Sequence, residues 1–186
     1  TGMGLERMAA IMQGVSSNYE TDILRSLVAV GERKSGKKLG ESEKTDKALR
    51  IMADHSRSIS FMIADGIMPS NEGRGYVLRR LIRRGATQAL LIGIEDHFFN
   101  DFVDELVRLM GDQYHELIEN RELIRQIILN EEKRFGENLD AVRTQLEKLI
   151  KDLPADQRVV PGETAFMFHD TYGFPIEWTI DFAEQH

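Results

Sequence analysis

The sequence predicts a mainly α-helical protein in which amphipathic helices pack as a bundle, and three observations support this fold class. Apolar residues recur at helical spacing, for example at positions 23, 24, 27 and 28. Glycines such as Gly66 and Gly111 stand where these periodic segments end. Apolar residues also step by four and three along residues 135–149, which is heptad spacing. With 186 residues, the chain can bury such a core in one or two domains.

Composition narrows the class of protein further. With 41% hydrophobic and 30% charged residues, the chain is typical of soluble globular proteins. No apolar run approaches the roughly 18 residues that a membrane span requires. The absence of cysteine excludes disulfides and thiolate metal sites, and it is compatible with the cytoplasm. We therefore expect a cytoplasmic location and no membrane partner.

The net charge of −7 is concentrated in one segment. Residues 95–152 hold 15 acidic and 8 basic side chains, whereas acidic and basic residues balance elsewhere. Because local patches rather than the total charge attract a polyanion, the acidic total does not exclude a nucleic-acid partner. We expect the acidic surplus to face water on a helical arm.

Two helices are expected in the first third of the chain. Residues 20–44 contain one amphipathic helix, followed from Gly31 by a glycine- and lysine-rich loop that we expect to be mobile and solvated. The alternative is that its lysines contact a phosphate. Thr45 and Asp46 supply an N-cap region for the next helix, which should end at Ala64. His55 falls on its apolar face, where we expect a buried, hydrogen-bonded side chain rather than a metal ligand.

The stretch from residue 66 to residue 84 carries the strongest functional signal. It begins as a loop, because Pro69, Ser70 and Asn71 are turn-forming residues and glycines follow at 73 and 75. A helix comes next, and on a helical wheel an arc of about 140° holds Arg79, Arg80, Arg83 and Arg84. The opposite, apolar side is expected to hold Val77, Leu78, Leu81, Ile82 and Ala86.

Four arginines on one face predict a phosphate-bearing partner. Like charges at i and i+4 destabilise a helix by about a few tenths of a kcal/mol per pair, and this face contains two such pairs. The planar guanidinium matches phosphate oxygens bidentately, so phosphates spaced along a backbone would offset that cost. The alternative is a solvated face paired with acidic groups elsewhere in the fold.

The rest of the chain is also expected to be helical. Residues 96–110 form one helix, and about 114–153 form a long one for which Asn130 is the candidate break point. Its heptad seam predicts packing against a neighbour within the chain rather than an oligomeric coiled coil, so we expect a monomer. Residues 164–168 fit a strand or a short helix, and the acidic turn before them favours helix. Pro175 suits the first position of a last helix.

Five segments, taken in order, resemble the alanyl-tRNA synthetases, a branch of the class II aminoacyl-tRNA synthetases. They are residues 2–7 (GMGLER), 13–22 (QGVSSNYETD), 53–57 (ADHSR), 65–80 (DGIMPSNEGRGYVLRR) and 168–175 (FHDTYGFP). The first is similar to the third signature motif of class II enzymes. The resemblance implies that residues 1–19 are the C-terminal end of the α/β aminoacylation core, a short strand and helix. Residues 20–186 would be the helical tRNA-recognition domain, with a long arm at about 112–153.

The resemblance also implies roles for individual residues. Gly2 and Gly4 would shape the adenine and ribose wall of an ATP site, and Arg7 would bind a phosphate of ATP. Asn71 and Asp170 match the pair that recognises the G·U wobble pair in the acceptor stem of alanine tRNA. The arginine face described above, Arg79, Arg80, Arg83 and Arg84, would then contact the tRNA backbone. Arg74 would either contact the backbone as well or order the loop. Without the resemblance, Asn71 would be interpreted as a turn former and Asp170 as a cap.

The implied enzyme attaches alanine to its tRNA with ATP and magnesium, and its editing domain would hold zinc. The first two signature motifs, the alanine pocket and the editing domain are absent from these 186 residues. We therefore expect this segment alone to be inactive and to hold no cofactor or metal, because one arginine cannot replace groups spread over several strands. The competing hypothesis is a non-catalytic helical module that docks an acidic protein surface or RNA.

Overall fold

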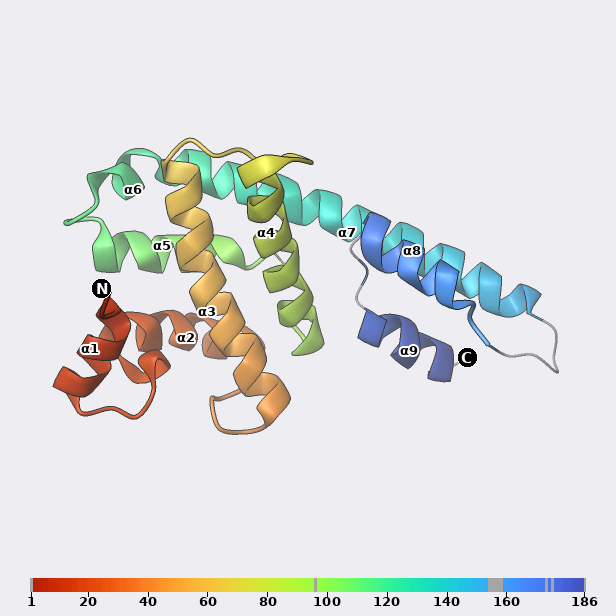
Figure 1. The fold of residues 1–186 in the computed structure, drawn as a ribbon, viewed down its shortest axis with the longest axis horizontal. Helices are drawn as coiled ribbons and strands as arrows, with labels where there is room; N and C mark the ends of the chain where they lie inside the picture. The colour runs from red at the N-terminus through yellow and green to blue at the C-terminus, as the bar shows by residue number, and fades with distance from the viewer. Residues whose placement is uncertain (1, 96, 154–158, 173, 175, 186) are drawn as a thin grey trace. The chain divides into compact units, whose positions relative to one another are not determined.

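The computed structural model describes residues 2–95, 97–153, 159–172, 174 and 176–185, and it confirms the mainly α-helical fold class (Figure 1). Within these residues the regular structure is helical and contains no β-strand. Residues 2–4, where the sequence predicts a short strand, have no regular structure. A search of the described helices finds none whose length and hydrophobicity would let it span a lipid bilayer.

The chain forms two compact units, Thr1–Glu132 and Lys133–His186. The predicted boundary between residues 19 and 20 is a functional one, between a catalytic core and a recognition domain. The division into compact units does not test it, so it stays a prediction. The helices of the first unit are α1 (Leu5–Gln13), the short 3-10 helix η1 (Asn18–Glu20), α2 (Asp22–Ser35), α3 (Glu43–Ala64), α4 (Gly73–Leu91), α5 (Phe99–Met110), α6 (His115–Glu119) and the first part of α7 (Arg121–Asp152).

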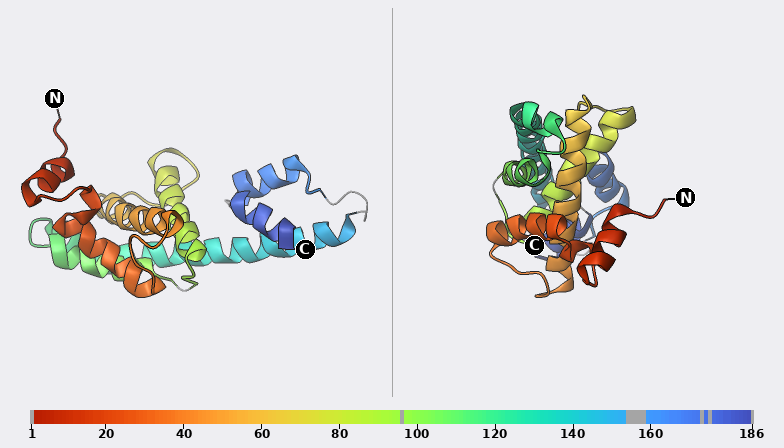
Figure 2. Two further views of the ribbon diagram at one scale, coloured as in Figure 1. Left: turned by 90° about the horizontal axis from the view of Figure 1, so that it is seen from below. Right: turned by 90° about the vertical axis from the view of Figure 1, so that its left-hand side faces the viewer.

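Helix α3 is at the centre of the first unit, where it packs against α2, α4, α5 and α6 (Figures 1 and 2). The core side chains of these helices are fully buried, among them Leu27, Leu49, Met52, Leu78, Ile82 and Phe102. Helix α4 also faces α5 closely, because a Cβ on Gly85 would lie 2.3 Å from the ring of Phe99. This core fixes α4, and α4 carries the predicted site.

The first predicted loop begins later than expected. Helix α2 continues through Gly31, which is buried against Leu49 of α3, and ends at Ser35. The prediction placed a breaker at Gly31 because glycine is a weak helix former, but tertiary packing outweighs that propensity here. Lys34 therefore lies on a helix, where it pairs with Asp101 of α5.

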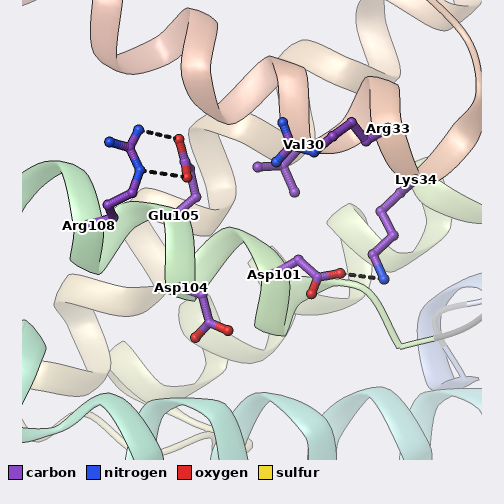
Figure 3. A pocket seen from close by; sticks show the side chains of 7 residues that line it. All are labelled: Val30, Arg33, Lys34, Asp101, Asp104, Glu105 and Arg108. Carbon is purple, nitrogen blue, oxygen red and sulfur yellow. Dashed lines mark hydrogen bonds and ion pairs between the residues drawn. The ribbon is translucent and has the colours of Figure 1, made fainter.

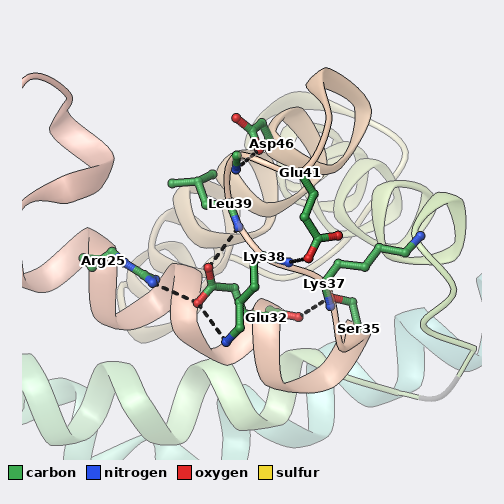
Figure 4. Close-up of polar contacts among 10 residues, drawn as sticks. Arg25, Glu32, Ser35, Lys37, Lys38, Leu39, Glu41 and Asp46 are labelled. Atoms are coloured by element: carbon green, nitrogen blue, oxygen red, sulfur yellow. Dashed lines mark hydrogen bonds and ion pairs between the residues drawn. The ribbon is translucent and has the colours of Figure 1, made fainter.

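Glu32, near the end of α2, bonds to the segment that connects α2 to α3 (Figure 4). Its carboxylate accepts a hydrogen bond from the Leu39 backbone N–H at 3.0 Å and pairs with Arg25 at 2.9 Å. Lys38 Nζ lies 3.9 Å from the same side chain. Burial by itself would raise the pKa of Glu32, but these donors and cations hold it below its usual value. Two lysines of the predicted loop therefore have carboxylate partners. Lys34 is on α2 and pairs with Asp101, and Lys38 is in the connection and lies near Glu32.

The predicted limits of α3 are partly right. The cap is Ser42, whose hydroxyl accepts the Thr45 N–H at 3.1 Å, so the cap expected at Thr45 and Asp46 is wrong. The end at Ala64 is confirmed, and the chain leaves the helix through Gly66, whose φ is 82°. His55 is 7% exposed and its Nδ1 lies 3.2 Å from Asp54 Oδ2, which confirms the expected buried, hydrogen-bonded histidine.

The long helical arm breaks at Asn120 and not at Asn130. Helix α6 ends there, and the Asn120 side chain donates a hydrogen bond to the Glu116 carbonyl at 2.9 Å. Asn130 is exposed within an uninterrupted α7. Both residues have the same helix propensity, so the local bond to the preceding turn decides which one ends a helix.

The second unit contains the rest of α7 with α8 (Gly162–Tyr172) and α9 (Ile176–Gln185). The helical interpretation of residues 164–168 is confirmed. The heptad seam is buried by the chain itself, with Phe135, Val142 and Leu146 at most 2% exposed, as expected for packing within the chain. Pro175, the predicted first position of the last helix, lies outside the described residues.

Candidate RNA-binding site

The loop before α4 lies tightly against the first turn of that helix. Ser70 Oγ donates to the Glu72 carbonyl at 2.8 Å, which closes the turn. A Cβ on Gly75 would lie 2.3 Å from both the Met68 carbonyl oxygen and Ser70 Oγ. Only a residue without a side chain permits this approach, so Gly75 fixes where the loop rests on the helix. The helix begins at Gly73, so Gly73 and Gly75, which were expected in the loop, lie on its first turn.

Asn71 is exposed in this loop, and among the described residues only its amide oxygen has a hydrogen-bond partner. The amide oxygen Oδ1 accepts a hydrogen bond from Arg79 Nη1, two turns along α4. Arg79 in turn points its Nε toward Glu131 Oε1 of α7 at 3.5 Å. The loop, α4 and α7 are therefore connected through three side chains.

The four-arginine face divides into two pairs. Arg79 and Arg83 share Glu131, whose side chain is 3% exposed, and Arg83 Nε lies 2.8 Å from Glu131 Oε1. For these two arginines the structure favours the alternative of a carboxylate partner within the fold. Their phosphate contacts stay a prediction.

Arg74, Arg80 and Arg84 form the exposed arginine set. All three are exposed, and none has a carboxylate oxygen within 4.0 Å among the residues that the structure describes. The pKa of Asp54 is lowered mainly by its hydrogen bond with His55, and the positive charge of Arg84 adds to this lowering. An exposed guanidinium without a carboxylate partner keeps its donors available for phosphate oxygens.

The apolar side of α4 differs from the helical wheel at Val77. Leu78, Ile82 and Ala86 are at most 7% exposed, as predicted, but Val77 is 48% exposed. The helix buries the stripe that faces α3 and, at Gly85, Phe99 of α5. Val77 lies about 100° from Leu78 around the helix axis, outside this stripe. The exposed side next to Arg80 therefore includes the half-exposed side chains of Tyr76 and Val77.

Glu131 is the residue that sequence reasoning missed. The acidic arm was expected to face water, but Glu131 is 3% exposed and Glu132 is 6% exposed. The sequence indicates such a buried acidic partner only indirectly. Two arginines at i and i+4 can share one acidic partner, but the sequence does not say that the partner stands 48 residues away.

The motif-3 segment is also exposed. Gly4 precedes α1 with a φ of 77°, and Arg7 lies on the first turn of that helix. Arg7 is exposed and has no carboxylate within 4.0 Å among the described residues. Its neighbour Glu6 instead pairs with Arg57 of α3 at 2.5 Å, and this hydrogen bond lowers the pKa of Glu6. Arg7 is therefore available to a phosphate group, as the resemblance implies.

Asp170 belongs to α8 in the second unit, whereas Asn71 belongs to the first. The side chain of Asp170 lies outside the described part of the structure. The pairing of these two residues at one base pair therefore stays a prediction.

One shallow depression of about 530 Å³ lies between α2 and α5, away from these residues (Figure 3). Four of its lining charges are paired with one another, Lys34 with Asp101 and Arg108 with Glu105 at 2.7 Å. Asp104 is paired with Arg121 at 2.9 Å. Arg33 also lines the depression and has no carboxylate oxygen within 4.0 Å among the described residues. One exposed guanidinium on an open surface does not by itself define a binding site. Among the described residues, no group of three or more histidines and carboxylates is placed to hold a metal ion.

Comparison with known proteins matches the whole chain. The family described as "tRNA synthetases class II (A)" matches residues 1–186. The chain is 45% identical over its full length to the alanine–tRNA ligase of Idiomarina loihiensis. It is 47% identical, over 98% of its length, to that of Pelotomaculum thermopropionicum. Each match covers 21% of the relative, so the chain spans about a fifth of the length of these proteins. The chain therefore belongs to the class II (A) tRNA synthetase family.

Proposed function

We propose that this chain is the part of an alanine–tRNA ligase that binds the acceptor stem of alanine tRNA and reads its G·U pair. The observation that carries the proposal is an exposed asparagine bonded to Arg79 of α4, the helix that also carries the exposed arginine set. The chain that holds them matches alanine–tRNA ligases over its whole length. Its expected compartment is the cytoplasm, with which the absence of cysteine is compatible.

In this proposal, Arg74, Arg80 and Arg84 contact phosphates of the acceptor stem. Phosphate contacts set the register of a protein on a nucleic acid but carry no sequence information. Each contact that is lost should weaken binding to all stems alike and reduce its salt dependence.

Asn71 and Asp170 supply base recognition in the same proposal. An amide can donate and accept at a base edge, whereas a carboxylate only accepts, which suits an exocyclic amino group. The exposure of Asn71 supports its half of this role. The role of Asp170 rests on the family resemblance.

A binding titration tests the proposal. The chain is titrated with two acceptor-stem hairpins, one with G·U and one with G·C, at low and physiological salt. Asn71→Ala is expected to cost about 1 to 3 kcal/mol on the G·U stem only. Arg80→Ala should weaken both stems equally and lower the slope of log affinity against log salt by about 1. Equal binding of both stems by the unmodified chain would mean that these residues do not recognise the base pair. If Arg80→Ala weakens binding of the G·U stem only, the roles assigned to Arg80 and Asn71 are reversed.

The parent enzyme, in this proposal, uses ATP and magnesium to activate alanine before transferring it to tRNA. Arg7 would hold a phosphate oxygen of ATP beside the backbone at Gly2 and Gly4. The exposed, unpaired guanidinium of Arg7 fits that role.

We also propose that the chain by itself does not activate alanine. Positioning and electrostatic groups from several elements are needed together, and Arg7 alone cannot supply them. Alanine-dependent ATP–pyrophosphate exchange with the purified chain should therefore stay at the level of a blank without protein. Exchange above that level that disappears in Arg7→Ala would contradict the proposal.

A further inference from the structure

A chain of three side chains runs from the buried surface of α7 to the exposed loop before α4. Glu131 on α7 is 3% exposed, Arg79 on α4 is 27% exposed, and Asn71 in the loop is exposed. Arg79 contacts both of the others, Glu131 through Nε and Asn71 through Nη1. We propose that Arg79 is a positioning residue that fixes the amide of Asn71, so that Asn71 presents an N–H donor to the RNA. The inference rests on the proposed function.

The chemistry of the two groups determines the direction of the amide. A guanidinium has five N–H donors and no acceptor, so it can bond only to the oxygen of an asparagine side chain. With Oδ1 turned toward Arg79, the Nδ2 amino group is on the other side. An asparagine without such a neighbour can turn its amide over and present either an acceptor or a donor. Arg79 removes that choice.

Arg79 can serve this purpose because it is itself held in place. Its Nε lies 3.5 Å from Glu131 Oε1, and Arg83 Nε lies 2.8 Å from the same oxygen. Arg83 is only 15% exposed, so the carboxylate is fixed by a largely buried partner. On the other side of Asn71, the close contact of Gly75 with Met68 and Ser70 restrains the loop backbone. Asn71 is therefore restrained through both its backbone and its side chain.

Fixing the amide before binding has a direct effect on selectivity. A donor of fixed direction favours a base edge with an acceptor at that position and leaves its own N–H unpaired against a wrong edge. A freely turning amide can adapt to either edge, and it also loses conformational freedom on binding. Arg79 is thus expected to contribute to the choice between stems rather than to overall affinity.

The experiment compares two neighbouring arginines on α4 by the same substitution. Arg79→Met removes the contact to Asn71, and Arg80→Met, the matched control, removes an exposed guanidinium that has no carboxylate partner among the described residues. Both proteins are titrated with the G·U and G·C hairpins, and circular dichroism checks that they remain folded. We expect Arg79→Met to reduce the G·U preference as much as Asn71→Ala does, between about 5-fold and 140-fold. Arg80→Met should weaken both stems and leave the preference unchanged.

The double variant Asn71→Ala with Arg79→Met sharpens this test. If Arg79 acts through Asn71, the double variant should have the same preference as Asn71→Ala alone. If Arg79→Met weakens both stems equally and keeps the preference, Arg79 is a phosphate contact and the inference is wrong.

A measurement without RNA separates this inference from the proposed function. The side-chain amide protons of Asn71, followed by 15N–1H NMR, should shift in Arg79→Met and remain in place in Arg80→Met. An unchanged Asn71 signal in Arg79→Met would overturn the positioning role whatever the RNA titration gives. If the signal shifts in Arg79→Met but the unmodified chain does not prefer the G·U stem, the proposed base recognition is wrong. The orientation of the Asn71 amide by Arg79 is then still supported.

Discussion

Phe99→Ala is expected to lower the free energy of unfolding by about 3 to 5 kcal/mol, the usual cost of removing a buried aromatic ring. Phe99 is 0% exposed at the start of α5 and stacks on Phe98 with 4.3 Å between ring centroids. Its ring also occupies the space left by the missing side chain of Gly85 on α4. The surrounding helices are held by their own contacts, so they can close the resulting cavity only in part.

Urea unfolding followed by circular dichroism measures this effect. The matched control is Leu123→Ala in the same unit, where the side chain is 50% exposed and a change within about 0.5 kcal/mol is expected. A loss of less than about 1 kcal/mol in Phe99→Ala would mean that the contact between α4 and α5 contributes little to the stability of the first unit.

Glu132→Gln is expected to stabilise the protein at pH 8 by up to about 3 kcal/mol and to have little effect at pH 5. Glu132 lies on α7, is 6% exposed, and accepts a hydrogen bond at 3.3 Å from the Phe98 N–H, which directly precedes α5. Burial raises its pKa from 4.5 to about 7. Hydrogen bonds from the Phe98 and Phe99 N–H groups and the charge of Lys34 oppose this rise without cancelling it. His97 Nδ1 lies 3.9 Å from the same carboxylate.

The direction of the pH effect follows from these values. Between pH 4.5 and about 7 the unfolded chain releases the Glu132 proton while the folded protein keeps it, so this group favours folding less as pH rises. Above about pH 7 the folded protein carries a buried charge, and the full cost is present. Glutamine has no proton to release and can still accept one N–H bond from α5.

Urea unfolding of both proteins at pH 5 and pH 8 tests this expectation. Carboxylates with lowered pKa, such as Glu6, Glu32 and Asp104, titrate alike in both proteins and cancel in the difference. Glu122→Gln, on the same helix but with an 84% exposed side chain, is the control and should show no such dependence. A difference of equal size at both pH values would contradict the raised pKa.

Much of the fold could be predicted from local patterns. Helix α3 ends where Gly66 predicts, and the buried face of α4 is correct at Leu78, Ile82 and Ala86. Errors arose where a contact that the apolar pattern does not show outweighs a local preference. Gly31 remains helical because Leu49 packs against it, and the arm breaks at Asn120 because that side chain bonds to the preceding turn.

The candidate site could be predicted less completely than the fold. The sequence identified Asn71 and the arginines of α4, because turn residues and helical periodicity are local signals. It did not identify Glu131, which pairs with Arg83 across 48 residues. Nor could it distinguish exposed Arg80 from Arg79, because the two are adjacent in the sequence and differ in what α7 and the loop place beside them.

The close contact at Gly75 has a consequence for protein engineering. Residues 66–72 could not be grafted alone onto another scaffold, because the Met68 carbonyl would meet the Cβ of any other residue at that position of the accepting helix. A graft would have to include about two turns of α4, from Gly73 to Arg79. It would also need a host carboxylate at the place that Glu131 takes here. The transferable module is therefore discontinuous, with a loop, a helix start and one acidic side chain supplied by a second helix.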